Sequence, residues 1–61
     1  MNNISDTVFN QIMDIRDSGE VNMMDAKAVF EIAIRKGYDE LADFIFTNTA
    51  KYSAFIISGQ R

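Results

Sequence analysis

The stretch NMMDAKAVFEIAIRKG, residues 22–37, decides the fold class, because both ends of a helix can be recognised in it. Asn22 is a strong helix N-cap, and Asp25 lies three residues later, where a carboxylate favours the same helix end. At the other end, two basic residues precede Gly37, which is the usual C-terminal pattern. We predict a helix that opens at Asn22 and stops at Gly37. The alternative interpretation of residues 22–25 is a recognition loop rather than a cap.

The apolar residues of this segment occupy more than one helical stripe. The stripes are Met23, Ala26, Val29 and Ala33; then Met24, Ala28 and Ile32; then Phe30 and Ile34. A helix that is apolar nearly all round is buried on several sides, and the middle helix of a small monomer is hard to cover so completely. One interpretation is a central helix with a few scattered exposed hydrophobics. We favour the other, an exposed apolar patch that marks a homodimer or partner interface.

Two further helices are expected on either side of this segment. The first begins after the N-cap Ser5 and stops at Gly19. Its apolar residues recur at helical spacing; they are Val8, Phe9, Ile12, Met13 and Ile15. The last begins after Asp39 and runs from Glu40 to about Ser58, with Gly59 as the stop.

The last helix contains a weak point at Thr47-Asn48-Thr49, a run of poor helix formers. This run leaves open a kink or a break that would create a separate fourth helix; we predict one bent helix. Its core stripe includes Tyr52, whereas Phe46 and Ile57 lie off that stripe. The prediction is therefore an all-α, small three-helix domain, with residues 1–61 forming a single domain.

Composition excludes several function classes. The 61 residues include no Cys and no His, so disulfides and the usual zinc sites are excluded and oligomerisation remains as a stabilising device. The net charge is −3, with a balance of −4 in residues 1–25. An acidic half disfavours phosphate binding, so direct nucleic-acid binding is not expected. No signal peptide or membrane span is recognisable, and we expect a cytoplasmic protein.

The sequence contains no recognisable catalytic machinery. The serines have no histidine or other base to activate them. The carboxylates of Asp39, Glu40 and Asp43 are explained by helix capping and the helix dipole. No calcium loop or phosphate-binding loop is present. We expect no enzyme, no catalytic residue, no cofactor and no metal.

Three stretches of the chain resemble a known family. They are IRDSGEVNMMDAKAV at 15–29, ELADFI at 40–45 and YSAFIISG at 52–59. They resemble a family of short uncharacterised phage, prophage and Firmicute proteins, a domain of unknown function. The resemblance implies a phage or mobile-element origin and brings no site residues. Phe30 and Phe46 depart from it at positions expected to be polar, so they are candidates for an interface particular to this protein.

These observations predict a non-catalytic protein-binding module of phage origin. It would inhibit or redirect a host protein, for example a defence nuclease, by occlusion, and would form a homodimer. An apolar helix face would anchor the partner and acidic side chains would steer it. The interface candidates are Met24, Phe30, Ile34 and Phe46 as anchors, with Asp14, Asp17 and Glu20 as the acidic rim.

Two alternatives remain open. The first is a small dimeric DNA-binding transcriptional regulator, in which dimerisation assembles a basic surface from four residues. They are Lys27, Arg35, Lys36 and Lys51. The second is a phage assembly cofactor, which needs only an interface and therefore has the same sequence requirements.

Overall fold

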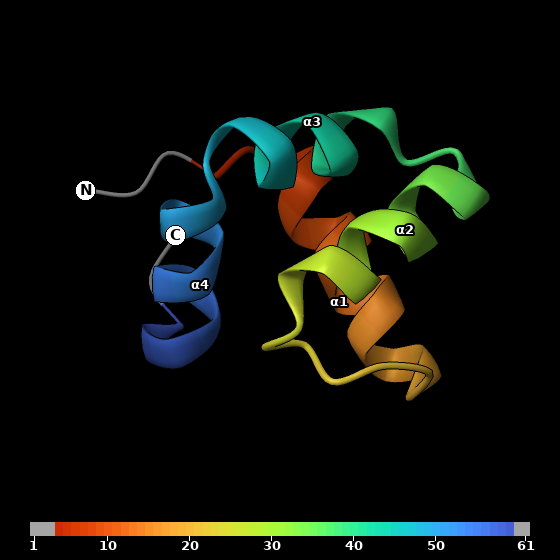
Figure 1. Ribbon diagram of the computed structural model, residues 1–61, viewed down its shortest axis with the longest axis horizontal. Coiled ribbons are helices and arrows are strands. Elements are labelled where there is room, and N and C mark those ends of the chain that lie inside the picture. Colours follow the sequence, from red (N-terminus) through yellow and green to blue (C-terminus); the bar gives the residue numbers. More distant parts are fainter. Residues whose placement is uncertain (1–3, 60–61) are drawn as a thin grey trace.

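The computed structural model describes residues 4–59, and within this range it is all-helical with no strand (Figure 1). Four helices follow one another along the described part of the chain. They are α1 (Asp6–Ser18), α2 (Ala26–Lys36), α3 (Asp39–Thr47) and α4 (Thr49–Ser58). The predicted all-α class is confirmed, whereas the predicted number of three helices is wrong by one. No helix among these is long and apolar enough to cross a bilayer.

The additional helix arises from a break at Asn48. Its φ of −136° and ψ of 49° are not helical. On either side, the Thr47 hydroxyl donates to the Asp43 carbonyl at 2.8 Å and the Thr49 hydroxyl donates to the Ile45 carbonyl at 2.7 Å. Such bonds from hydroxyls to the preceding turn bend helices, and here two of them flank a poor helix former. The prediction of one bent helix is therefore wrong, and its alternative, a break with a fourth helix, is what the chain adopts.

The start of α2 also differs from the prediction. Asp25 is the N-cap, with its carboxylate accepting the Ala28 N–H at 3.1 Å. The Asn22 side chain instead accepts the Met24 N–H at 2.9 Å and closes a turn before the helix. Both residue types cap helices well, and the local pattern does not decide between them. The predicted opening at Asn22 is therefore wrong, because α2 starts at Ala26.

This arrangement predicts unequal effects of two cap substitutions. Asp25→Ala is expected to lower the free energy of unfolding by about 1 kcal/mol, because it removes the bond to a free N–H at the start of α2. Asn22→Ala is expected to have a smaller effect, since the turn that Asn22 closes lies outside the helix. Urea denaturation followed by circular dichroism measures both. A larger loss in Asn22→Ala would contradict the assignment of Asp25 as the cap.

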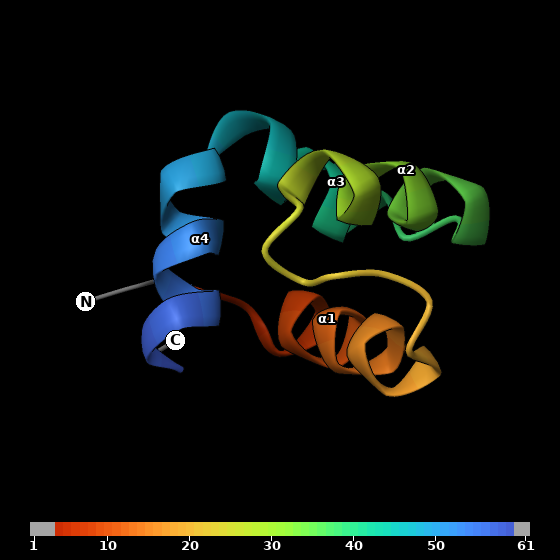
Figure 2. The same ribbon diagram turned by 60° about the horizontal axis from the view of Figure 1, so that its bottom comes forward.

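The core lies where the four helices meet. Figures 1 and 2 show α2 and α3 side by side, with α1 along one side of this pair and α4 across the end where α3 stops. The buried residues come from every helix and from the segment before α1; they are Ile4, Val8, Ile12, Ile15, Val29, Ala33, Leu41, Ala42, Ile45, Tyr52 and Phe55. The rings of Phe9 and Phe55 meet edge to face, 5.9 Å apart, and join α1 to α4. Of the predicted apolar positions of the first helix, Val8, Ile12 and Ile15 are buried, as is Tyr52 of the last stripe. Phe9 and Met13 are half-buried and pack against this core.

Two side-chain hydrogen bonds connect distant parts of the chain. The Leu41 N–H, in the first turn of α3, donates to Gln11 Oε1 of α1 at 3.2 Å. Tyr38 holds the N-cap position of α3 without a side-chain capping bond, so the predicted cap at Asp39 is wrong and Gln11 serves instead. The Tyr52 hydroxyl donates to the Met23 carbonyl at 2.8 Å, which ties α4 to the α1–α2 connection.

Candidate protein-binding surface

Large apolar side chains remain exposed after the core has formed. Within residues 4–59 they are Met24, Ile34, Phe46 and Ile57, with exposed fractions of 50%, 55%, 76% and 73%. Phe46 and Ile57 are the two residues that lie off the predicted stripe of the last helix. Ile34 lies on the third stripe of α2, whose other member, Phe30, is half-buried against the core and against α3. A single exposed hydrophobic is ordinary, whereas several from neighbouring helices define a surface.

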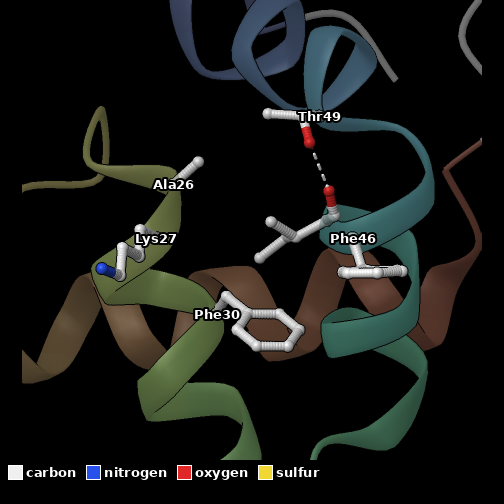
Figure 3. A pocket seen from close by; sticks show the side chains of 6 residues that line it. Ala26, Lys27, Phe30, Phe46 and Thr49 are labelled. Atoms are coloured by element: carbon white, nitrogen blue, oxygen red, sulfur yellow. Dashed lines mark hydrogen bonds between the residues drawn. The ribbon is translucent and has the colours of Figure 1, made fainter.

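The centre of this surface is an aromatic pair. The rings of Phe30 in α2 and Phe46 in α3 lie 6.2 Å apart between centroids and are inclined by 34°. Figure 3 shows the Phe30 ring between α2 and α3, with the Phe46 ring beside it over α3. Phe30 is half-buried and Phe46 is exposed. The pair therefore has a packed base and an open outer side, which is the geometry of an anchor for another molecule.

Two shallow hollows flank the aromatic pair. The first has a volume of about 370 Å³ and the second about 360 Å³. The first is lined by Ala26, Lys27, Phe30, Ile45, Phe46 and Thr49 (Figure 3), and the second by Phe30, Ile34, Asp39, Ala42, Asp43 and Phe46. We call the surface formed by these residues the α2–α3 face. No residue of α1 lines it, because α1 lies on the other side of the helix pair (Figure 2).

The α2–α3 face carries opposite charges at its two ends. Lys27 lines the first hollow, near the start of α2. Asp39 and Asp43 line the second, near the start of α3. None of these three forms an ion pair with another residue of the range 4–59. Their charges are therefore available to a partner.

The predicted acidic rim lies elsewhere and is largely paired. Asp14 accepts a hydrogen bond of 2.6 Å from the Tyr38 hydroxyl and lies 3.6 Å from the Lys36 ammonium group. The Tyr38 hydrogen bond, followed by the charge of Lys36, lowers the pKa of Asp14, and the same hydrogen bond raises the pKa of Tyr38. Glu20 pairs with Arg35 at 2.5 Å. Both carboxylates thus tie α1 and its following loop to the end of α2.

The seven predicted interface residues divide into two groups. The α2–α3 face brings together Phe30, Ile34 and Phe46. The other four do not line it; they are Met24, in the turn before α2, and the acidic residues Asp14, Asp17 and Glu20. Asp17 is exposed at the end of α1. In the described part of the chain, no hydrogen bond joins it to Asn22 of the alternative recognition loop or to the neighbouring Arg16.

Sequence reasoning missed the charged members of the face. Asp39 and Asp43 are four residues apart, and Asp43 precedes Phe46 by three, so all three share one side of α3. Lys27 precedes Phe30 by three in α2. These spacings are a usable signal, although helix capping is by itself a sufficient reason for carboxylates at the start of a helix.

The basic residues that a DNA-binding dimer would need are spread over the structure. Arg35 and Lys36 are engaged with Glu20 and Asp14. Lys27 is on the α2–α3 face and Lys51 is exposed on α4. Two of the four positive charges are therefore balanced within the chain.

A third hollow, of about 260 Å³, lies between α1 and α4. Its lining includes Met13, Met23 and Phe55, with Arg16 as the one charged residue of that lining. It is smaller than the hollows of the α2–α3 face. Among residues 4–59, no group of three acidic side chains is placed so that it could hold a metal ion.

Comparison with known proteins gives a family. The model of the family described as "Domain of unknown function (DUF5049)" matches residues 4–60, nearly the whole chain. Searches of curated proteins and of solved structures found no match. The chain that carries the α2–α3 face therefore belongs to the DUF5049 family, whose function is unknown.

Proposed function

We propose that this protein is a non-catalytic protein-binding module of phage or mobile-element origin. It acts in the host cytoplasm, where it inhibits or redirects a host protein, for example a defence nuclease, by occlusion. The observation that carries the proposal is the Phe30–Phe46 pair, in which Phe46 is exposed, with a hollow on each side of the pair. A few anchor residues that become desolvated when a partner binds supply most of the binding energy of protein interfaces, and aromatic residues are common among them.

The charge distribution supports the same mechanism. Asp39 and Asp43 lie beside the aromatic anchor without an ion pair in the range 4–59, and the chain carries a net charge of −3. Carboxylates at the edge of an apolar patch attract a basic partner surface during encounter and fix its orientation. Occlusion needs no reacting group, since a bound module blocks its partner's surface by its own volume.

Affinity capture from a bacterial host lysate tests this function. The tagged protein is expected to retain one host protein in near-stoichiometric amount. Phe46→Asp is expected to weaken the affinity by a factor of about 30 or more, as truncation of a hot spot does, and to lower the retained amount with it. Phe30→Asp is expected to do the same. Mass spectrometry of the retained proteins measures the loss.

Ile57→Asp is the matched control, because Ile57 is as exposed as Phe46 but lines none of the three hollows. This variant is expected to retain the same protein as the unmodified chain. Equal retention by Phe46→Asp and the unmodified chain would overturn the assignment of the α2–α3 face. Retention of nucleic acid alone, lost at moderate salt, would favour a DNA-binding regulator instead.

A further inference from the structure

We propose that the α2–α3 face binds a second copy of this chain, through a two-fold axis at the Phe30–Phe46 pair that places Lys27 of each copy against Asp39 and Asp43 of the other. The inference rests on the proposed protein-binding role of this face and names its occupant. It follows from the order of residues across the face, which is cation, aromatic pair, carboxylates.

This order makes the face complementary to itself. In a two-fold dimer the same surface is used twice, so each contact between two different residues occurs twice. The axis lies in the plane of the interface, passes through the aromatic pair and runs perpendicular to the line from Lys27 to the two carboxylates. Rotation about it exchanges the two ends of the face. Each ammonium group then meets two carboxylates, and neither end meets a like charge.

The charged residues of the α2–α3 face differ from those elsewhere in that they have no ion-pair partner within residues 4–59. Asp14 and Glu20 already have partners in Lys36 and Arg35. No such partner exists within residues 4–59 for Lys27, Asp39 and Asp43. All three line a hollow beside the exposed ring of Phe46. Aromatic residues at the centre and charged residues at the rim are the usual arrangement of an interface.

The size of the chain favours self-association. A domain of about 60 residues buries only about 60% of the surface of its unfolded chain, and a partner subunit is one way to bury more. Cysteine and histidine are absent from this sequence, so a disulfide is excluded as a substitute. A host protein that uses the same aromatic pair has to displace the second copy, and the two equilibria are then linked by mass action.

The first test is the molar mass of the purified protein by sedimentation equilibrium, from micromolar to near-millimolar concentration. The unmodified chain is expected to reach twice the mass of the 6.9 kDa monomer. Phe46→Asp is expected to stay monomeric over the whole range with an unchanged helical circular-dichroism spectrum, while Ile57→Asp dimerises normally. A monomer at every concentration overturns the inference. If capture of a host protein by the same preparation still depends on Phe46, the proposed function survives that failure.

The second test is a charge exchange between the two ends of the face. Lys27→Glu is expected to weaken dimerisation by about tenfold or more, because each side chain at position 27 then repels both Asp39 and Asp43 of the other copy. Asp43→Lys is expected to have a smaller effect, because it inverts only one of the two pairs at each end. The double variant is expected to dimerise better than Lys27→Glu, since the exchanged charges at positions 27 and 43 meet again across the axis while Asp39 still faces the new carboxylate. Lys51→Glu, with the same change of charge on α4, is the control and is expected to leave the dimer unchanged.

The first test checks which face forms the dimer, and the second checks whether the two copies are related by a two-fold axis. A dimer that is insensitive to Phe46→Asp overturns the α2–α3 face as its interface. A double variant that dimerises no better than the weaker single variant overturns the two-fold arrangement. Recovery in the double variant, together with a loss of dimer at high salt, supports it.

Discussion

Leu41→Ala is expected to lower the free energy of unfolding by about 2–5 kcal/mol. Leu41 is fully buried, and it lies in α3, which packs against each of the other three described helices. Truncation removes apolar contact area and leaves a cavity that several helices would have to close together. A domain of this length is expected to have a total stability of about 3–9 kcal/mol, so the substitution removes a large part of it.

Urea denaturation followed by circular dichroism at 222 nm measures this loss. Ile57→Ala is the control, because Ile57 is 73% exposed and its truncation should change stability by less than about 0.5 kcal/mol. Similar losses in the two variants would contradict the position of Leu41 at the centre of the core.

Between pH 10 and pH 12 the unmodified protein is expected to lose about 2–3 kcal/mol of stability through Tyr52 alone. Tyr52 is fully buried, and burial raises its pKa to about 12 from the ordinary value of 10. The neutral phenol is therefore favoured in the folded state. This stability is complete below pH 10, where both states are protonated, and is lost as the pH rises through the folded pKa.

Tyr52→Phe separates this effect from the other titrations. At pH 7 the variant lacks the hydrogen bond to the Met23 carbonyl and is expected to be less stable by about 1 kcal/mol. Its stability is expected to fall less steeply than that of the unmodified protein between pH 10 and pH 12. Tyr38→Phe removes only the contribution of a partly exposed hydroxyl whose pKa is raised by its hydrogen bond to Asp14, so this variant should keep the part of the fall that comes from Tyr52. A constant difference between Tyr52→Phe and the unmodified protein over this range would disprove the link between burial and pH dependence.

The core and the α2–α3 face use different residues, so folding and binding can be perturbed independently. Leu41 and Tyr52 are fully buried, whereas Phe46 is 76% exposed. Variants of the first group should change stability before they change association. Phe46→Asp should do the reverse, which makes it suitable for testing both proposals.

The sequence by itself determined the helical class, the start of the first helix and the three helix ends that a glycine marks. Ser5 caps α1 as predicted, and Gly19, Gly37 and Gly59 each follow a helix with positive φ values near 70°. These signals are local, because a cap or a left-handed glycine acts on backbone groups within one helical turn. The excess of apolar residues on the middle helix was likewise visible, since helical periodicity assigns residues to stripes without any knowledge of the neighbours.

Only the tertiary structure decided which stripes are covered and which charges are neutralised. The α3 N-terminus obtains its hydrogen-bond acceptor from Gln11, 30 residues earlier, and Asp14 and Glu20 find their partners on the far end of α2. The break at Asn48 ends α3 next to the start of α2, where Phe46 meets Phe30. None of these contacts follows from spacing along one helix. They depend on how helices cross, and this is set by the packing of the whole core.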